Sequence, residues 1–104
     1  MEWQMGKSVG PLTGIVTKFN LVYPHPSILF DVKTPTGELQ HWAGMLRPTP
    51  AILRENGWTR SSIKPGDTIT ITLTPHKTAP FVGNTRRIEV NGTLLADNVA
   101  AMIP

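Results

Sequence analysis

The residues best suited to chemistry form the run Tyr23-Pro24-His25-Pro26. Histidine exchanges a proton near neutral pH, and the prolines on both sides restrict the backbone that carries it. A rigid imidazole of this kind can act as a general base or orient a ligand. The simpler alternative is that His25 ties its loop to the rest of the fold by a hydrogen bond. The sequence leaves both interpretations open.

A cofactor-free enzyme is one hypothesis for this histidine. In it, Tyr23 or Asp31 assists His25 as acid or base in a lyase, isomerase or hydrolase. No nucleophile elbow or comparable motif accompanies these residues, so the sequence does not decide whether the protein is an enzyme. The side chains expected to contact a ligand are Phe30, His41, Trp42 and Met45.

Metal and cofactor binding are not expected. Zinc and copper sites take about three or four convergent nitrogen or sulfur ligands. The chain has no cysteine, and its three histidines, His25, His41 and His76, lie far apart in sequence. Glycine-rich loops that cradle phosphate groups are also absent. We therefore predict neither a metal site nor a cofactor.

The elements that position these residues have the period-two pattern of β-strands. The clearest is Thr68 to Thr74, which alternates apolar and polar residues after the turn Lys64-Pro65-Gly66-Asp67. Further strands are predicted over residues 12–19, 27–33, 39–46, 85–90 and 93–95, with loops at 20–26 and 75–84. Adjacent Ile15 and Val16 beside Gly14 indicate a bulge or bend in the first strand.

One short helix is predicted before the long alternating strand. Thr49 is a good N-cap, Pro50 suits the first helical position, and Gly57 follows the end. Three strands, a helix and further strands are typical of a small oligonucleotide/oligosaccharide-binding (OB-type) barrel of five or six strands. We expect one mainly β domain over residues 1–104, with its core at about 11–95, a loose N-terminus and an apolar C-terminal tail.

Several residues across this barrel also resemble a known family. They are Gly14-Ile15-Val16, Pro24-His25, Asp31-Val32, Gly37, Trp42, Leu53-Arg54, Gly57-Trp58-Thr59 and Lys64-Pro65-Gly66-Asp67. Together they are similar to the bacterial family catalogued as domain of unknown function 6152, from about Pro11 to Leu95. The resemblance implies a small, mostly exported protein of Gram-negative bacteria without an established activity.

The chain departs from that family's pattern at two positions near the expected pocket. Tyr23 stands where members usually have asparagine, and Met45 stands where they usually have an acid. The resemblance therefore implies a more apolar pocket here than in other members. The paired N-terminal histidines of many members are also missing, which argues against any metal role that they support.

Composition limits the remaining classes of function. The formal net charge is +3 with 16% charged residues, so nucleic-acid binding is conceivable, but few aromatic residues are available for base stacking. In a regular strand Arg86 and Arg87 would also point to opposite faces. No apolar run approaches the ~20 residues of a membrane span, and the first residues lack a secretion signal. Localisation stays unknown: the protein is either cytoplasmic or exported after loss of a leader.

The sequence favours a binding module for a small, partly apolar ligand or a protein partner. A cofactor-free enzyme using His25 is the second hypothesis, and single-stranded nucleic-acid binding is the third. Val99, Met102 and Ile103 give the tail enough apolar surface to pack on something, including a second copy of the chain.

Overall fold

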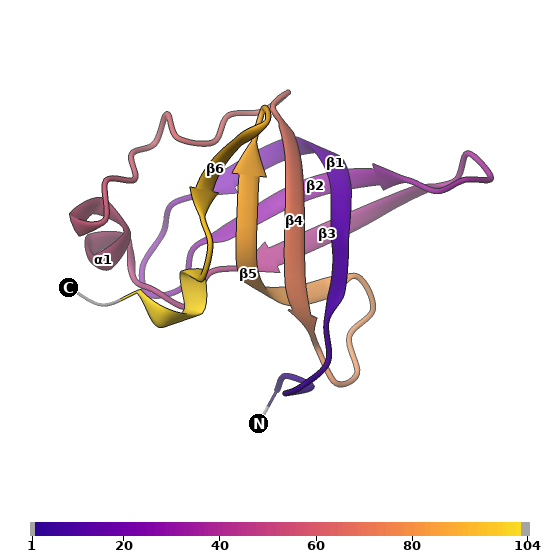
Figure 1. The fold of residues 1–104 in the computed structure, drawn as a ribbon, viewed down its shortest axis with the longest axis horizontal. Coiled ribbons are helices and arrows are strands. Elements are labelled where there is room, and N and C mark those ends of the chain that lie inside the picture. Colours follow the sequence, from indigo (N-terminus) through magenta and orange to yellow (C-terminus); the bar gives the residue numbers. More distant parts are fainter. Residues whose placement is uncertain (1, 103–104) are drawn as a thin grey trace.

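The computed structural model describes residues 2–102, which form a closed β-barrel with one short helix at one end (Figure 1). The elements in chain order are β1 (Val9–Asn20), β2 (Ser27–Lys33), β3 (Leu39–Met45), α1 (Pro50–Glu55), β4 (Thr68–Pro75), β5 (Val82–Val90), β6 (Thr93–Ala96) and the 3-10 turn η1 (Val99–Ala101). This confirms the predicted mainly β barrel with its helix between the third and fourth strands.

Closure of the barrel depends on one parallel pairing. The strands lie in the order β3-β2-β1-β4-β5-β6, with antiparallel neighbours throughout. The start of β5 then returns to β3, where Ala43 pairs with Val82 and Met45 with Asn84. Five strands thus form the ring, and β6 extends the sheet from β5.

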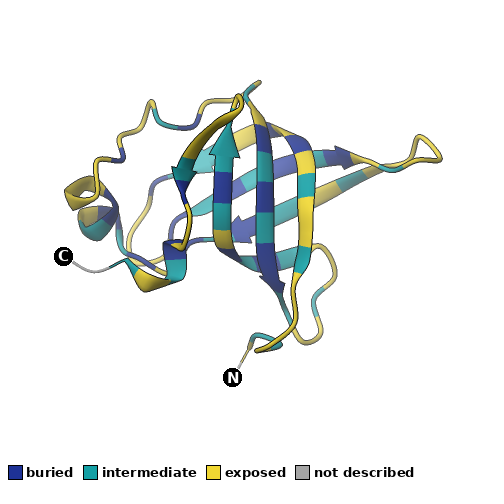
Figure 2. Cartoon of the chain, in the orientation of Figure 1, coloured by how far each residue is buried: buried dark blue, intermediate teal, exposed yellow. Residues whose placement is uncertain are grey.

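The inner face of the barrel is filled by alternate residues of the strands, which appear as bands of buried positions in Figure 2. Ile28 and Phe30 of β2 and Ile69 and Ile71 of β4 are fully buried. One cluster of buried residues joins them: Val16, Leu21, Val32, Leu46, Leu53, Trp58, Ile63, Leu73, Ile88, Ala96 and Val99. Leu29 and Asp31 alternate with these positions on β2, so they face outward.

β1 bends so that it can pair with β2 on one side and β4 on the other. Its register with β2 shifts between Val16 and Lys18, close to the bend indicated by the sequence. Gly14 lies at a close approach to β2: a Cβ there would come within 2.6 Å of the Asp31 carbonyl oxygen. A side chain at residue 14 would therefore separate the two strands.

The helix has the predicted limits. The Thr49 hydroxyl accepts a hydrogen bond from the Ile52 amide at 3.3 Å, and Pro50 occupies the first turn. Gly57 has φ +89°, the left-handed conformation that ends a helix at low cost. Leu53 and Trp58 are both buried, so this segment covers one end of the core.

Two strands begin earlier than predicted. β1 starts at Val9, across the sequence Gly10-Pro11, and β5 starts at Val82 within the predicted 75–84 loop. Residues 82–84 are held by pairing with β3, a contact across about 40 positions that local patterns do not reveal.

β5 is also irregular, which changes the expected placement of its arginines. Its register with β4 shifts so that Thr72 pairs with Arg87 while Leu73 pairs with Thr85. Thr85 and Ile88 are both buried, and Arg86 and Arg87 between them both have accessible side chains. The expectation of opposite faces for a regular strand is therefore wrong, because a bulge at Arg86 interrupts the alternation.

The C-terminal tail packs on this chain's own barrel. Val99 is buried in the core and Met102 packs against it. Ile103, the third apolar residue of the predicted tail, lies outside the described residues. Association through the tail stays a prediction.

Asp67 joins two turns at one end of the barrel. Its carboxylate accepts a hydrogen bond from the Lys64 amide at 2.9 Å and another from the Asn91 side chain at 3.2 Å. Asn91, with φ +50°, and Gly92 form the tight turn between β5 and β6. Both hydrogen bonds stabilise the charged carboxylate and lower the pKa of Asp67 below its ordinary value of 3.8. The bond from the Lys64 amide has the larger effect.

This lowered pKa predicts a pH-dependent effect of Asp67→Asn. A carboxylate with a lower pKa in the folded state stabilises the fold above its unfolded pKa and stops doing so as pH falls through the folded one. The variant should melt below the natural protein above about pH 5, and the difference should shrink toward pH 2. Thermal melts across this range measure it. Glu55→Gln is the control, and an Asp67→Asn deficit that does not change with pH contradicts the role of the charge.

Candidate functional site

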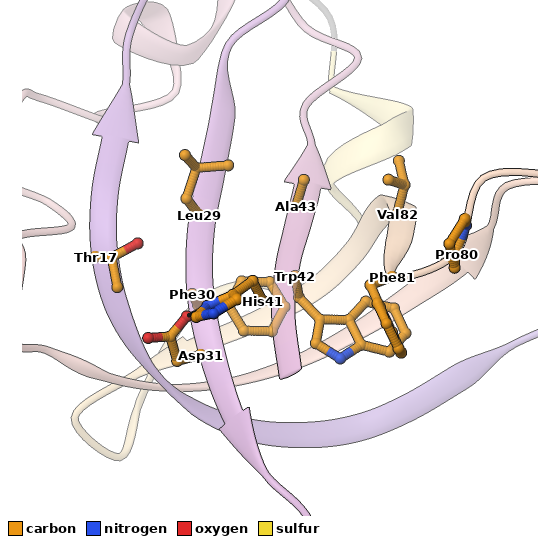
Figure 3. Close-up of a pocket in the computed structure, with 10 residues that line it drawn as sticks. All are labelled: Thr17, Leu29, Phe30, Asp31, His41, Trp42, Ala43, Pro80, Phe81 and Val82. Atoms are coloured by element: carbon orange, nitrogen blue, oxygen red, sulfur yellow. Dashed lines mark hydrogen bonds and ion pairs between the residues drawn. The ribbon is translucent and has the colours of Figure 1, made fainter. Parts of the chain in front are cut away.

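The outside of the barrel carries a groove over β1, β2 and β3, which we call the outer groove (Figure 3). Its volume is about 420 Å³, within the range of small-molecule sites. It is lined by Thr17, Leu29, Phe30, Asp31, His41, Trp42, Ala43, Pro80, Phe81 and Val82. Its walls are mainly apolar, with one polar pair among them.

That pair is formed by Asp31 and His41, which stand opposite each other on β2 and β3. The Asp31 carboxylate lies 2.6 Å from His41 Nδ1. The His41 side chain is 78% exposed and that of Asp31 is 23% exposed. Because Nδ1 faces the carboxylate, the second ring nitrogen is left for a ligand. Asp31 also lines an adjoining hollow of about 380 Å³ with the exposed side chains of Ile15 and Leu39.

An aromatic cluster forms part of the lining of the outer groove (Figure 3). Phe30, fully buried, stacks on Trp42 with ring centres 6.4 Å apart. Trp42 meets Phe81 edge to face at 5.4 Å and donates a hydrogen bond from its indole N–H to Gln40 at 3.1 Å. Phe30 thus supports the groove from within the core, whereas Trp42 connects the core to Phe81.

Phe81 is one of the groove residues that sequence reasoning missed. It precedes β5, is 42% exposed, and has φ +57°, a conformation rare for a bulky residue. Its carbonyl accepts a hydrogen bond from the Ala43 amide at 2.9 Å, which fixes its backbone beside β3. No local pattern marks it, because its place depends on the β3–β5 pairing.

His25 and Met45 lie in a different groove, near the N-terminal segment. This second groove has two adjoining parts of about 120 and 520 Å³, which share Trp3, His25, Arg47 and Asn84. Met45 and Glu2 line the smaller part. His25 and Asp31 therefore line separate cavities, and the structure does not bring them together.

His25 is exposed, and its side chain makes no hydrogen bond or ion pair to any residue in 2–102. Tyr23 is 78% exposed and lines neither groove. His76, in contrast, stabilises the loop between β4 and β5. Its Nδ1 accepts hydrogen bonds from the amides of Thr78, at 3.1 Å, and Ala79, at 2.9 Å.

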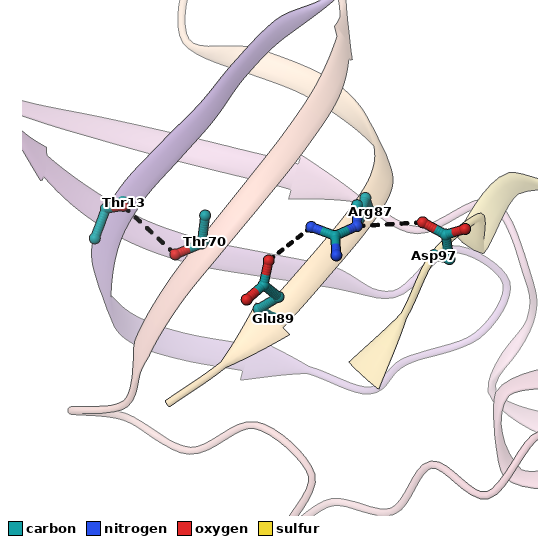
Figure 4. Close-up of polar contacts among 5 residues, drawn as sticks. All are labelled: Thr13, Thr70, Arg87, Glu89 and Asp97. Atoms are coloured by element: carbon teal, nitrogen blue, oxygen red, sulfur yellow. Dashed lines mark hydrogen bonds and ion pairs between the residues drawn. The ribbon is translucent and has the colours of Figure 1, made fainter. Parts of the chain in front are cut away.

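Other polar contacts lie on the barrel surface, within β5, between β5 and the residue after β6, and between β1 and β4 (Figure 4). Arg87 contacts Glu89 at 2.6 Å and Asp97 at 3.2 Å, and these carboxylates raise its pKa. Thr13 and Thr70 lie 3.5 Å apart between β1 and β4. These contacts lie outside both grooves, so we assign them to the fold.

Residues 2–102 contain no group of three or more histidine, cysteine, aspartate or glutamate side chains placed to hold a metal ion. None of the helices in this part of the chain is long and apolar enough to cross a membrane.

Comparison with known proteins agrees with the resemblance seen in the sequence. The chain matches a family of unknown function, DUF6152, over residues 1–94. No curated protein and no solved structure gives a significant match. The match includes every residue that lines the outer groove and ends before η1. The chain therefore belongs to the family of unknown function DUF6152.

Proposed function

We propose that the protein is a binding module for a small, partly apolar ligand, held in the outer groove. One observation carries this proposal: the groove combines apolar walls with a single oriented polar pair. Leu29, Ala43 and Val82 offer apolar contact, and Asp31 with His41 offers hydrogen bonds at one place. Ligand sites commonly combine apolar walls with a few placed polar groups in this way.

The topology of the barrel supports the same location for the ligand site. We assign the barrel to the OB type, on its ring order β1-β2-β3-β5-β4 and its helix between β3 and β4. Barrels of this type bind ligands on the face of strands 2 and 3, beside the loops that follow strands 1 and 4. The outer groove lies on that face, and Pro80 and Phe81 reach it from the β4–β5 loop.

The backbone at Phe81 adds independent support. A bulky residue in the left-handed region costs of order 1–3 kcal/mol, and such strain concentrates at ligand contacts. Here the left-handed backbone at Phe81 keeps a half-exposed aromatic ring in the lining of the groove. The carboxylate of Asp31 in the groove disfavours the phosphates of nucleic acid, so the nucleic-acid hypothesis ranks lower.

A cofactor-free enzyme is the second candidate, with His41 in place of His25. The 2.6 Å contact from Asp31 to Nδ1 favours the tautomer whose free nitrogen is a base. In this mechanism His41 removes a proton from a substrate bound over Leu29 and Ala43. A protein partner bound on the same face is the remaining alternative.

A fragment screen monitored by ¹H–¹⁵N correlation NMR spectra of the protein tests the binding proposal. Fragments that bind should shift the amide resonances of Leu29, His41 and Phe81. The Phe81→Ala substitution should weaken the affinity of these fragments about tenfold, because it removes an aromatic contact. Leu94→Ala is the matched control, because Leu94 is 48% exposed on β6, outside the groove. Fragments that change chemically during incubation would favour the enzyme.

Two outcomes would contradict this assignment. One is a set of fragments whose shifts lie outside the β1–β3 face. The other is equal loss of affinity in Phe81→Ala and Leu94→Ala, which would indicate nonspecific apolar contact.

A further inference from the structure

The second groove differs from the outer groove in its charge. Its larger part, about 520 Å³, is bordered by the N-terminal segment, residue 47, β5 and η1. Arg47 and Arg86 line it together with His25, and none of the carboxylates within residues 2–102 lines this part. We propose that it binds a small organic carboxylate that carries an apolar body.

Arg86 is held in place for this role. The bulge in β5 puts its side chain on the outside, and its guanidinium donates a hydrogen bond to the buried Thr74 hydroxyl at 3.3 Å. That contact uses one of five donors, so four remain for an anion. A guanidinium presents its donors as a planar fork that matches a carboxylate.

Neither arginine is neutralised within the described residues. The ion pairs within 4.0 Å involve Arg87 with Glu89 and Asp97, and His41 with Asp31. Glu89 and Asp97, the acidic residues nearest in sequence to Arg86 and to η1, therefore both pair with Arg87. Two like charges that line this part of the groove without an ion-pair partner favour an added anion.

One acidic residue lies nearby. Glu2 lines the adjoining 120 Å³ part together with Arg47, but its carboxylate pairs with neither arginine within 4.0 Å. Its carbonyl is engaged by the Lys77 amide at 2.9 Å, which holds the segment against the β4–β5 loop. Among the described residues that line the two parts, Arg47 and Arg86 therefore outweigh the single carboxylate of Glu2.

The other walls indicate what the anion carries. Trp3 is fixed against His76, with ring centres 5.4 Å apart, and Met5 is exposed beside it. Ala100 and Ala101 of η1 form another part of the lining. A flat hydrocarbon can lie between these walls while its carboxylate meets Arg86, and the amide of Asn84 adds a neutral hydrogen-bonding group.

The probe for this groove is 2-naphthoate, with 2-naphthamide as its neutral counterpart. We expect naphthoate to shift the amides of Asn84, Arg86 and Ala101, and naphthamide to bind at least about tenfold more weakly. Calorimetry should give a similar loss for Arg86→Gln and for Arg47→Gln. Arg60→Gln, which removes the same charge from an exposed loop, should change the affinity less than about twofold. Added salt should weaken naphthoate binding.

Three results would overturn the proposal. They are equal affinity for naphthoate and naphthamide, equal loss in Arg60→Gln and Arg86→Gln, and no binding of naphthoate by the folded protein at millimolar concentration. Melting curves of each variant confirm folding, and the exposure of Arg47 and Arg86 makes unfolding by substitution unexpected. Variants of Phe81 should leave this groove unaffected, since that residue lines only the outer groove.

Discussion

Replacing Gly83 with alanine is expected to destabilise the protein by about 1–3 kcal/mol, because the new methyl group has no room. Its Cβ would lie 2.6 Å from the Leu73 Cβ and 3.1 Å from the Thr74 carbonyl oxygen. The obstructing atoms are fixed to the β4 backbone, so relief requires β5 to move away. Gly83 also pairs with Gly44 in the contact that closes the barrel. Denaturant unfolding measures the loss.

Gly44→Ala is the matched control for this prediction. Its Cβ would meet the Thr85 hydroxyl at 2.9 Å and the end of the Ile71 side chain at 3.2 Å. Side-chain ends can turn aside, so this variant should lose less stability than Gly83→Ala. Equal losses would mean that side-chain crowding, and not the rigid β4 backbone, limits the closure.

Thr85→Val is expected to stabilise the protein by about 1–3 kcal/mol. Thr85 is fully buried on the inner face of β5, and its hydroxyl has no hydrogen-bond partner among the described residues. Valine has nearly the same shape and removes the buried polar atom. At about 4–8 °C per kcal/mol for a domain of this size, the melting temperature should rise measurably.

Thr74→Val separates this effect from a general preference for valine in strands. Thr74 is also buried, but its hydroxyl accepts the hydrogen bond from Arg86. Its replacement should destabilise by about 0.5–1.5 kcal/mol. A decrease in stability in Thr85→Val would show that the hydroxyl is satisfied in solution.

Local patterns predicted most of the fold. Alternation located β2 and β4, and the caps at Thr49 and Gly57 gave the helix limits. The inner face of β3 was ambiguous in sequence because both faces are mixed. In the structure Gly44 faces inward, where a larger residue would meet Thr85. Such a requirement arises only once β3 and β5 are adjacent.

The candidate sites were predicted less well, for the same reason. Asp31, Phe30, Trp42 and His41 were identified one by one, and β2–β3 pairing does bring them together. Their expected grouping with His25 is not found, because His25 precedes the start of β2 and lines the second groove with Arg47 and Trp3. Arg86 was expected to follow strand alternation, which a bulge cancels.

The β3–β5 closure also affects how the chain can be made. A ribosome delivers β1, β2 and β3 long before residues 82–84, so the nascent half-barrel has an unpaired β3 edge and an uncovered face around Phe30. Pairings across about 40 residues form slowly compared with local hairpins. Chains stopped before β5 should therefore aggregate or require a chaperone, whereas chains released after β5 can complete the ring unaided.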